Sequence, residues 1–237
     1  QIIRFIDKPW QEYVYHDIPI FASIVRPADP LAAVQVLEKL IKAKPLEFGK
    51  KVQAECASGP YANEFVRSEP MKFAVSQLQR LKALPVDTVL IGQTGAGKDT
   101  AARWLHQQSG VKGEFVHVNC AAMPEQLFEA ELFGVMAGAF TGAQKDRPGK
   151  LELANNGTLY LDEMDSLPLP CQAKLLNALQ YRGATRLGGQ SFYTSSFRVI
   201  ASTKASLPDL VVQQKFREDL HFRLSVSQVR IPSLAER

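Results

Sequence analysis

Residues 86–98 read Val-Asp-Thr-Val-Leu-Ile-Gly-Gln-Thr-Gly-Ala-Gly-Lys. The apolar run from Val86 to Ile91 predicts a short strand, and the glycines open a helix that begins at about Gly97. Glycines let backbone N–H groups wrap around a phosphate without side-chain clashes, and a helix N-terminus adds partial positive charge. The stretch therefore predicts a phosphate-binding loop in which Lys98 reaches the β- and γ-phosphates. The alternative is an ordinary glycine-rich turn between a strand and a helix.

The residue after Lys98 departs from the usual pattern of such loops. Asp99 stands where a Ser or Thr normally binds magnesium. Thr100 is adjacent but rotated around the predicted helix. The pattern alone therefore leaves magnesium binding by this loop open.

Two acids end a second predicted strand, which reads Thr-Leu-Tyr-Leu-Asp-Glu over residues 158–163. An acid at the carboxyl end of a strand in a parallel sheet faces the nucleotide crevice. Asp162 then holds Mg²⁺ through water, and Glu163 activates the attacking water as a general base. Taken alone, two acids after a strand indicate a solvated strand end. Together with the loop they predict hydrolysis of a nucleoside triphosphate.

From Pro70 onward, strand patterns alternate with helix patterns. Helices are predicted over residues 70–84, 97–108, 124–133, 168–181 and 215–223, and strands over 86–91, 115–118, 158–161, 197–201 and 226–231. This alternation predicts an α/β fold with a central parallel sheet that is covered by helices on both faces.

Composition narrows the class of protein. Of the 237 residues, 46% are hydrophobic and 22% charged, which excludes disorder as the main state. No apolar stretch is long enough to span a membrane. The 3 cysteines and 4 histidines are scattered, so the sequence predicts neither a disulfide framework nor a zinc site. Few, unpaired cysteines predict a cytoplasmic location. A net charge of +4 is too small to indicate nucleic-acid binding by electrostatics.

The first part of the chain is predicted to be a small α/β segment. An apolar run over residues 17–27 predicts a strand, and a helix is predicted from Asp29 to Ala43. We therefore expect an N-terminal segment over residues 1–55, a linker over 56–69 and an ATPase domain over 70–237. Because the chain begins with Gln1, we expect it to be a piece of a longer protein.

Several motifs resemble those of one bacterial family. Glu-Leu-Phe-Gly at residues 131–134 is followed by Gly-Ala-Phe-Thr-Gly-Ala at 138–143, and Phe-Arg-Glu-Asp-Leu stands at 216–220. These motifs are similar to the signature of sigma-54-dependent transcriptional activators, whose AAA+ ATPase domains remodel the sigma-54 RNA polymerase holoenzyme. The stretches Gly-Lys-Asp and Leu-Tyr-Leu-Asp-Glu-Met-Asp-Ser resemble activators of type III secretion genes. The resemblance implies an AAA+ P-loop three-layer sandwich.

The resemblance also implies site residues. ATP and Mg²⁺ are the implied cofactors, with Asp162 as the metal-binding residue. An acid after the lysine is usual in this family, which accounts for Asp99. The residues implied to bind ATP are Gly92, Gln93, Thr94, Gly95, Ala96, Gly97, Lys98, Asp99, Thr100, Ala154, Asn155, Asn156, Gly157, Thr158, Leu159, Tyr160, Leu161, Asp162, Glu163 and Lys204.

Partner contacts follow from the same resemblance. Asn119 resembles a switch that holds the catalytic glutamate, and Arg217 and Arg223 resemble arginine fingers that reach a neighbouring subunit in a ring, typically a hexamer or a ring with related activator subunits. The implied sigma-54 contact loop comprises Gly138, Ala139, Phe140, Thr141, Gly142 and Ala143.

Physical reasoning leaves alternatives for three of these residues. Arg217 and Arg223 are about 240° apart on a regular helix, so either the helix breaks or only one of them is a finger. Arg223 is otherwise expected to pair with Asp219 on the surface. Phe140 is displayed at a mobile tip or, without the family pattern, packs into the core.

The sequence departs from the family pattern at two places. Lys204 replaces the asparagine expected in the sensor strand, and a lysine does not orient a water as an amide does. The chain stops at Arg237, before the expected helical lid and the helix-turn-helix that binds enhancer DNA. Residues 24–27 and the following helix resemble the end of a degenerate response-regulator receiver, and the alternative is an unrelated linker domain. The alternatives to a sigma-54 activator are another AAA+ motor and a nucleotide-binding scaffold without turnover.

Overall fold

The computed structural model describes residues 68–237, and their centre is a five-stranded parallel sheet. In spatial order the strands are β2 (Phe115–Asn119), β5 (Gly157–Asp162), β8 (Phe197–Thr203), β1 (Thr88–Ile91) and β9 (Ser227–Arg230). Every neighbouring pair is parallel, so all five carboxyl ends lie at one edge of the sheet. The predicted α/β class and parallel sheet are confirmed.

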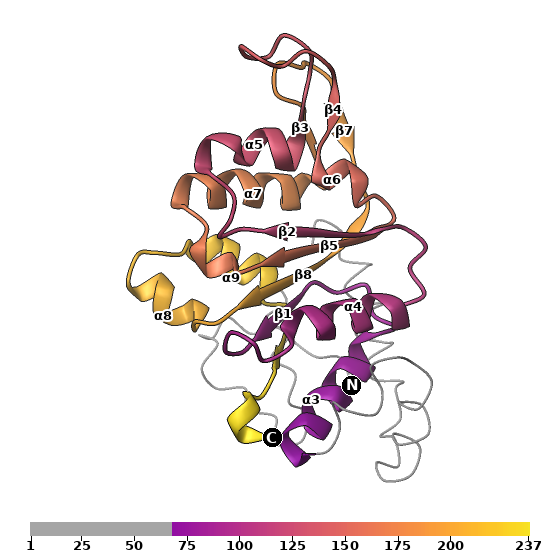
Figure 1. Cartoon of the computed structure of the whole chain (residues 1–237), viewed down its shortest axis with the longest axis vertical. Coiled ribbons are helices and arrows are strands. Elements are labelled where there is room, and N and C mark those ends of the chain that lie inside the picture. Colours follow the sequence, from indigo (N-terminus) through magenta and orange to yellow (C-terminus); the bar gives the residue numbers. More distant parts are fainter. Residues whose placement is uncertain (1–67) are drawn as a thin grey trace, which may run out of the picture.

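Helices cover both faces of this sheet, which gives three layers (Figure 1). One face is covered by α3 (Glu69–Leu81) and α4 (Lys98–Gln108). The other face carries α5 (Glu125–Phe133), α6 (Lys150–Leu153), α7 (Leu169–Tyr181) and α9 (Glu218–Leu224), and α8 (Leu207–Val212) packs beside α9. The structure therefore has the predicted three-layer arrangement.

The alternation of side chains along each strand divides the apolar core into two clusters. Leu159 and Leu161 of β5 pack with α5, α7 and α9, whereas Tyr160 between them packs against α3 and α4. Val199 and Ile200 of β8 divide in the same way. Successive side chains of a strand point to opposite faces of the sheet. A strand that is covered on both faces therefore needs a nearly continuous apolar run, as this sequence has.

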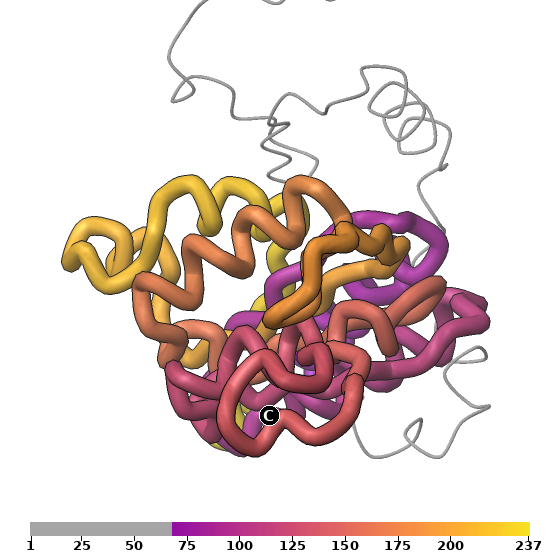
Figure 2. Tube along the Cα trace, turned by 90° about the horizontal axis from the view of Figure 1, so that it is seen from above, coloured from indigo at the N-terminus to yellow at the C-terminus, as the bar shows by residue number. Residues whose placement is uncertain are grey.

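Four short strands escaped sequence prediction. They form two small antiparallel pairs, β3 (Gly134–Val135) with β4 (Arg147–Pro148), and β6 (Gly183–Thr185) with β7 (Phe192–Thr194). Strands of two or three residues are too short to show a periodic pattern. Figure 1 shows that the chain between β3 and β4 projects from the rest of the molecule. Figure 2 looks down on this chain and shows the β6–β7 connection beside it.

Two helix boundaries differ from the predictions by three residues, and the others by at most one. The helix predicted over residues 70–84 ends at Leu81, and the helix predicted from Lys215 begins at Glu218. The strand over residues 17–27, the helix over 29–43 and the N-terminal segment and linker lie outside the described residues, apart from the start of α3. Within residues 68–237, no helix has the length and apolar character needed to cross a bilayer.

Candidate nucleotide site

The glycine-rich loop joins the carboxyl end of β1 to the first residue of α4. Gly95 and Gly97 have φ angles of 79° and 83°, in the left-handed region that favours glycine. A Cβ at Gly92 would lie 2.7 Å from the carbonyl oxygen of Ile231, so the close approach of the residue after β9 also requires glycine. The backbone amides in the first turn of α4 have no intrahelical acceptor. The loop therefore has the conformation and the donors that a phosphate group needs.

Lys98 folds back over this loop. Its Nζ donates to the carbonyl oxygens of Gly92 at 2.7 Å and Gln93 at 2.9 Å. Burial lowers the pKa of the lysine, and nearby carboxylates oppose that shift. Those carboxylates belong to Asp162, Asp165 and Glu163. The lysine is therefore placed between the loop and the acids that end β5.

Asp99 is the second residue of α4, directly after Lys98. One carboxylate oxygen accepts a hydrogen bond from Nε of Arg103 at 2.9 Å, one helical turn away. The other oxygen, Oδ1, is buried and has no hydrogen-bond partner among residues 68–237. Thr100 follows in the same first turn. The position that holds a hydroxyl in most such loops here holds a buried, unpartnered carboxylate oxygen.

Asp162 is the last residue of β5 and is held by three donors. Its Oδ1 accepts hydrogen bonds from the hydroxyl of Tyr160 at 3.0 Å, from the backbone N–H of Glu163 at 3.1 Å and from the hydroxyl of Ser202. Burial tends to raise the pKa of this carboxyl, but the hydrogen bonds outweigh it and hold the pKa below its ordinary value. Asp162 is therefore a fixed carboxylate at the carboxyl edge.

Glu163 adopts a backbone conformation that is rare for residues other than glycine. Its φ and ψ are 50° and 47°, in the left-handed region, which costs about 1–3 kcal/mol. Its N–H lies between Oδ1 of Asp162 and Oγ of Ser202, 3.1 Å from each. Strain of this kind persists only where the surroundings fix the residue.

Two further predicted residues lie at this same edge. Asn119 ends β2 in register with Asp162, and its side-chain oxygen accepts hydrogen bonds from the N–H groups of Ala121 at 3.0 Å and Ala122 at 3.1 Å. Lys204 follows β8, and its backbone N–H lies 3.4 Å from Oδ1 of Asp165. Its charge contributes to lowering the pKa of Lys98, so it faces the same site.

The structure does not bring the segment from Ala154 to Leu161 to this edge, which corrects the predicted ATP-binding set. The side chains of Ala154 and of Thr158 to Leu161 are buried in the protein core. Thr158 contacts His106 in the last turn of α4, 2.8 Å between Oγ1 and Nδ1. That turn is eight residues from Lys98, or about 12 Å along the helix. Asn155 and Asn156 precede β5 and Gly157 is its first residue, all at its amino end, so only Asp162 and Glu163 of this segment reach the loop.

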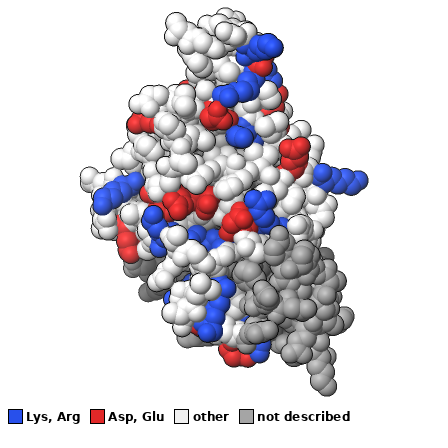
Figure 3. Space-filling view, viewed as in Figure 1, with Lys and Arg blue, Asp and Glu red and all other residues white. Residues whose placement is uncertain are grey.

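Sequence reasoning missed Ser202 and Asp165. Both lie among residues of the site, but each is a common residue type with no fixed spacing from the loop. On the face of the molecule that is seen in Figure 3, acidic side chains lie across the middle with basic side chains beside them. Among residues 68–237 no three His, Cys, Asp or Glu side chains are grouped to hold a metal ion by themselves.

The segment between β3 and β4 forms the projecting loop. Gly138 and Gly142 have φ angles of 83° and 111°, and the N–H of Gly138 donates to the carbonyl oxygen of Ala143 at 2.7 Å. Phe140 is 44% exposed at the tip, and Thr141 beside it is also exposed. The alternative in which Phe140 packs into the core is therefore wrong.

A second loop, between β6 and β7, supports the first and was not predicted. The N–H of Met136 donates to the carbonyl oxygen of Leu187 at 2.9 Å. The N–H of Leu187 donates to the carbonyl oxygen of Gly134 at 2.9 Å. A Cβ added at Gly188 would lie 2.7 Å from the Cβ of Ala139. The two loops are therefore in direct contact, as Figure 1 shows at the top of the molecule.

Arg217 and Arg223 have different surroundings. Arg217 is the N-cap of α9 and lies outside the regular helix, where its guanidinium pairs with Asp219 at 2.7 Å. The side chain of Arg217 is 42% exposed. The expected surface pair between Arg223 and Asp219 is therefore wrong, because Asp219 is engaged by Arg217 instead.

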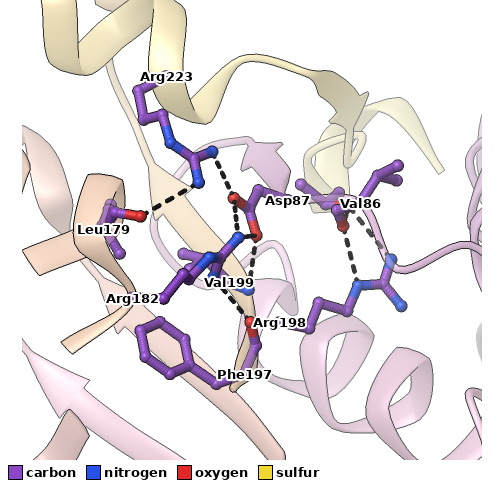
Figure 4. A network of polar contacts seen from close by, with 9 residues as sticks. Val86, Asp87, Leu179, Arg182, Phe197, Arg198, Val199 and Arg223 are labelled. Atoms are coloured by element: carbon purple, nitrogen blue, oxygen red, sulfur yellow. Dashed lines mark hydrogen bonds and ion pairs between the residues drawn. The ribbon is translucent and has the colours of Figure 1, made fainter. Parts of the chain in front are cut away.

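Arg223 points inward, to the amino end of the sheet (Figure 4). Its guanidinium donates to Oδ2 of Asp87 at 2.8 Å and to the carbonyl oxygen of Leu179 at 3.2 Å. Arg182 binds the same carboxylate at 3.0 Å, and the N–H of Val199 donates to its other oxygen at 3.0 Å. Both terminal nitrogens of Arg223 are thus used within its own chain.

Fold and site together define a P-loop nucleotide-binding domain of the AAA+ class. The family model described as "Sigma-54 interaction domain" matches residues 65–230, and the chain belongs to that family. The chain is 52% identical over 158 residues to the pathogenicity locus probable regulatory protein HrpS of Pseudomonas syringae pv. syringae, covering 67% of this chain and 52% of HrpS. The chain spans about half the length of the curated relatives it matches.

Two more comparisons agree with this assignment. The probable regulatory protein WtsA of Pantoea stewartii subsp. stewartii is 48% identical over 173 residues, which cover 72% of this chain and 54% of WtsA. The crystal structure of NtrX from Brucella abortus in complex with ATP superimposes with a TM-score of 0.67 and 35% identity, covering 72% of this chain and 39% of NtrX. The predicted family and fold are confirmed.

Proposed function

We propose that this chain is the ATP-hydrolysing module of a transcriptional activator that remodels the sigma-54 RNA polymerase holoenzyme. One observation carries the proposal: the glycine-rich loop with Lys98, the carboxylate of Asp162 and the strained Glu163 meet at one edge of the sheet. Membership of the family and the exposed Phe140 loop support the sigma-54 part.

The residues of the site fit ATP with Mg²⁺. The amides of the loop and the first turn of α4 suit the phosphates, and Lys98 suits the β- and γ-phosphate oxygens. The unpartnered oxygen of Asp99 and the carboxylate of Asp162 suit a hydrated magnesium ion. When bound, that ion neutralises charge on the phosphates. Glu163 would take the proton of the attacking water, and Asn119 would control the position of the Glu163 side chain.

Arg217 is the stronger candidate for an arginine finger in a ring, typically a hexamer of this chain or a ring with related activator subunits. Its side chain is exposed and lies outside the regular helix, whereas Arg223 is bound to Asp87. The start of α9 at Glu218 places Arg217 outside the regular helix, which supports Arg217 over Arg223 as the finger. Lys204 would contact the γ-phosphate, as a point charge.

Residues 138–143 would contact sigma-54 through Phe140 and Thr141, with the β6–β7 loop beneath them. The relatives named as probable regulatory proteins of a pathogenicity locus support a role at genes of that kind. The motif resemblance extends this proposal to type III secretion genes, with the protein acting in the cytoplasm. Enhancer DNA would be bound by a C-terminal part of the protein beyond this chain.

The experiment measures phosphate release and sigma-54 open-complex formation by the same preparations. Lys98→Ala is expected to abolish ATP binding, and Thr141→Ala to spare ATP hydrolysis while ending open-complex formation. A wild-type protein that binds ATP without releasing phosphate would support a nucleotide-dependent scaffold instead. Open-complex formation by Thr141→Ala at the wild-type rate would show that the loop assignment is wrong. ATP hydrolysis by the wild type without open-complex formation would favour another AAA+ motor.

A further inference from the structure

Ser202 lies between the two halves of the candidate site. It belongs to β8, the strand that separates β5, which ends in Asp162, from β1, which leads into the phosphate loop. The N–H of Gly92 donates to the carbonyl oxygen of Thr203 at 3.0 Å, so the end of β8 is attached to the start of the loop. Ser202 itself is completely buried.

The pleat of the sheet places Ser202 on the same face as Asp162. Leu161 is in register with Ala201, so Asp162 and Ser202 are the next residues along the two strands. Tyr160 and Ile200, two residues earlier, both pack against α3 and α4. Because residues two apart on a strand share a face, Ser202, Tyr160 and Asp162 all point toward the α4 side, where Lys98 begins the helix.

The hydroxyl of Ser202 makes two hydrogen bonds, one in each direction. It donates to Oδ1 of Asp162 and accepts from the N–H of Glu163 at 3.1 Å. A single buried hydroxyl thus orients the carboxylate and also holds the backbone of Glu163 at a φ of 50°. The hydroxyl of Tyr160 also donates to Asp162, at 3.0 Å, but it accepts no hydrogen bond from the N–H of Glu163.

We infer that Ser202 is a positioning residue that sets the geometry of both acids for hydrolysis. The inference rests on the proposed function, since it assigns a role at that same site. Without the hydroxyl, Glu163 loses a partner that compensates its strained backbone and relaxes toward ordinary φ values. Its carboxylate then moves relative to the attacking water, and displacements of about 1 Å cost about 10²-fold in rate.

The inference predicts an effect on turnover but not on nucleotide binding. In the proposed function the loop and Lys98 hold the phosphates. The Ser202 hydroxyl makes no hydrogen bond to the loop or to Lys98. Ser202→Ala should therefore lower kcat by about 10–100-fold, since a misplaced general base forfeits much of its usual contribution. The KM for ATP should change by less than about threefold, and Ser202→Thr, which keeps the hydroxyl, should restore most of kcat.

Three further variants isolate the cause. Tyr160→Phe removes one bond to Asp162 and leaves Glu163 untouched, so its kcat should fall less than that of Ser202→Ala. Ser195→Ala removes another buried serine hydroxyl, which donates to the carbonyl oxygen of Leu151 at 2.6 Å at the amino end of β8, and should leave kcat unchanged. Glu163→Gln should lower turnover by about 10²–10⁴-fold, which tests whether the measured activity belongs to this site.

The test combines phosphate release with the affinity for a fluorescent ATP analogue, measured with and without Mg²⁺, and with thermal unfolding. Support requires a lower kcat for Ser202→Ala, an unchanged affinity for the analogue and rescue by Ser202→Thr. Equal kcat values for wild type and Ser202→Ala would overturn the inference, as would equal losses in Ser202→Ala and Ser195→Ala. Absence of turnover in the wild type would instead overturn the proposed function.

Discussion

Asp162 and Asp87 are carboxylates at opposite edges of one sheet, the first partly buried and the second buried, and they are stabilised in different ways. Asp162 is the last residue of β5; its Oδ1 accepts from two neutral hydroxyls and a backbone N–H, and its Oδ2 lies 3.6 Å from Nε2 of His117. Asp87 precedes β1 at the amino edge and is bound by the guanidinium groups of Arg182 and Arg223. Hydroxyls orient a carboxylate and leave its charge available to a cation, whereas two arginines neutralise it.

This difference separates a site from a structural junction. The side chain of Asp162 is 23% exposed, but that of Asp87 is 2% exposed. Asp87 connects β1, the end of α7 and α9, which lie far apart in the sequence. Exposure and the chemistry of the partners therefore assign the two acids to different tasks, although both stand at strand ends.

The largest expected effect concerns the two arginines. Arg217→Ala should reduce ATP turnover of the assembled protein by about 10³–10⁵-fold with little change in stability, as removal of an arginine finger does. Arg223→Ala should mainly lower stability, because it removes a partner of Asp87. Phosphate release and urea unfolding of both variants check this. Loss of turnover in Arg223→Ala at unchanged stability would reverse the assignment of the two residues.

The next effect concerns the carboxyl edge. Glu163→Gln should lower turnover by about 10²–10⁴-fold because the general base is lost, while ATP binding persists. Glu114→Gln makes the same chemical change at an exposed residue next to the amino end of β2 and serves as the matched control. If both variants hydrolyse ATP at the wild-type rate, Glu163 is not the base.

At the amino edge the expected effect is on folding. Asp87→Asn should lower the free energy of unfolding by about 3–5 kcal/mol, because it leaves two partly buried guanidinium groups without their counter-charge. Asp219→Asn removes an exposed partner of Arg217 and should cost about 0–1 kcal/mol. Urea unfolding measures both. Similar losses in the two variants would show that burial of Asp87 does not matter.

The smallest effect concerns the backbone of Arg182, which ends α7 with a φ of 48°. Helices commonly end in this left-handed conformation at glycine, so an arginine here is strained. Both Arg182→Gly and Arg182→Ala remove the bond to Asp87, but only glycine also removes the strain. Arg182→Gly should therefore be more stable than Arg182→Ala by about 1–2 kcal/mol in urea unfolding. Equal stabilities would show that the backbone is not strained.

Much of the fold could be predicted because its elements are long enough to show a pattern. The apolar runs of β1 and β5 and the periodic helices carry local information, and so do the glycines before Lys98. The pairs β3–β4 and β6–β7 could not be predicted, since two or three residues have no period. Ser202 could not be recognised either, because its partners lie 39 and 40 residues away.

The predicted ATP-binding stretch from Ala154 to Glu163 shows where a linear motif fails. A strand runs from the amino edge of the sheet to the carboxyl edge, so a motif along the strand extends over both edges. Only the last two residues of this motif, Asp162 and Glu163, reach the phosphate loop. The arginines show the same limit. Sequence spacing places Arg217 and Arg223 on one helix, but the helix begins at Glu218 and Asp87 binds Arg223.

The sequence by itself determined the phosphate loop, the acids after β5 and the alternation of strands and helices, because these depend on residue type and short spacing. Tertiary structure alone decided the strand order, the contact between the two projecting loops and the partners of Asp162 and Asp87. The reason is physical. Hydrogen bonds and ion pairs between strands depend on which residues the packed sheet brings within about 3 Å, and sequence distance does not encode that.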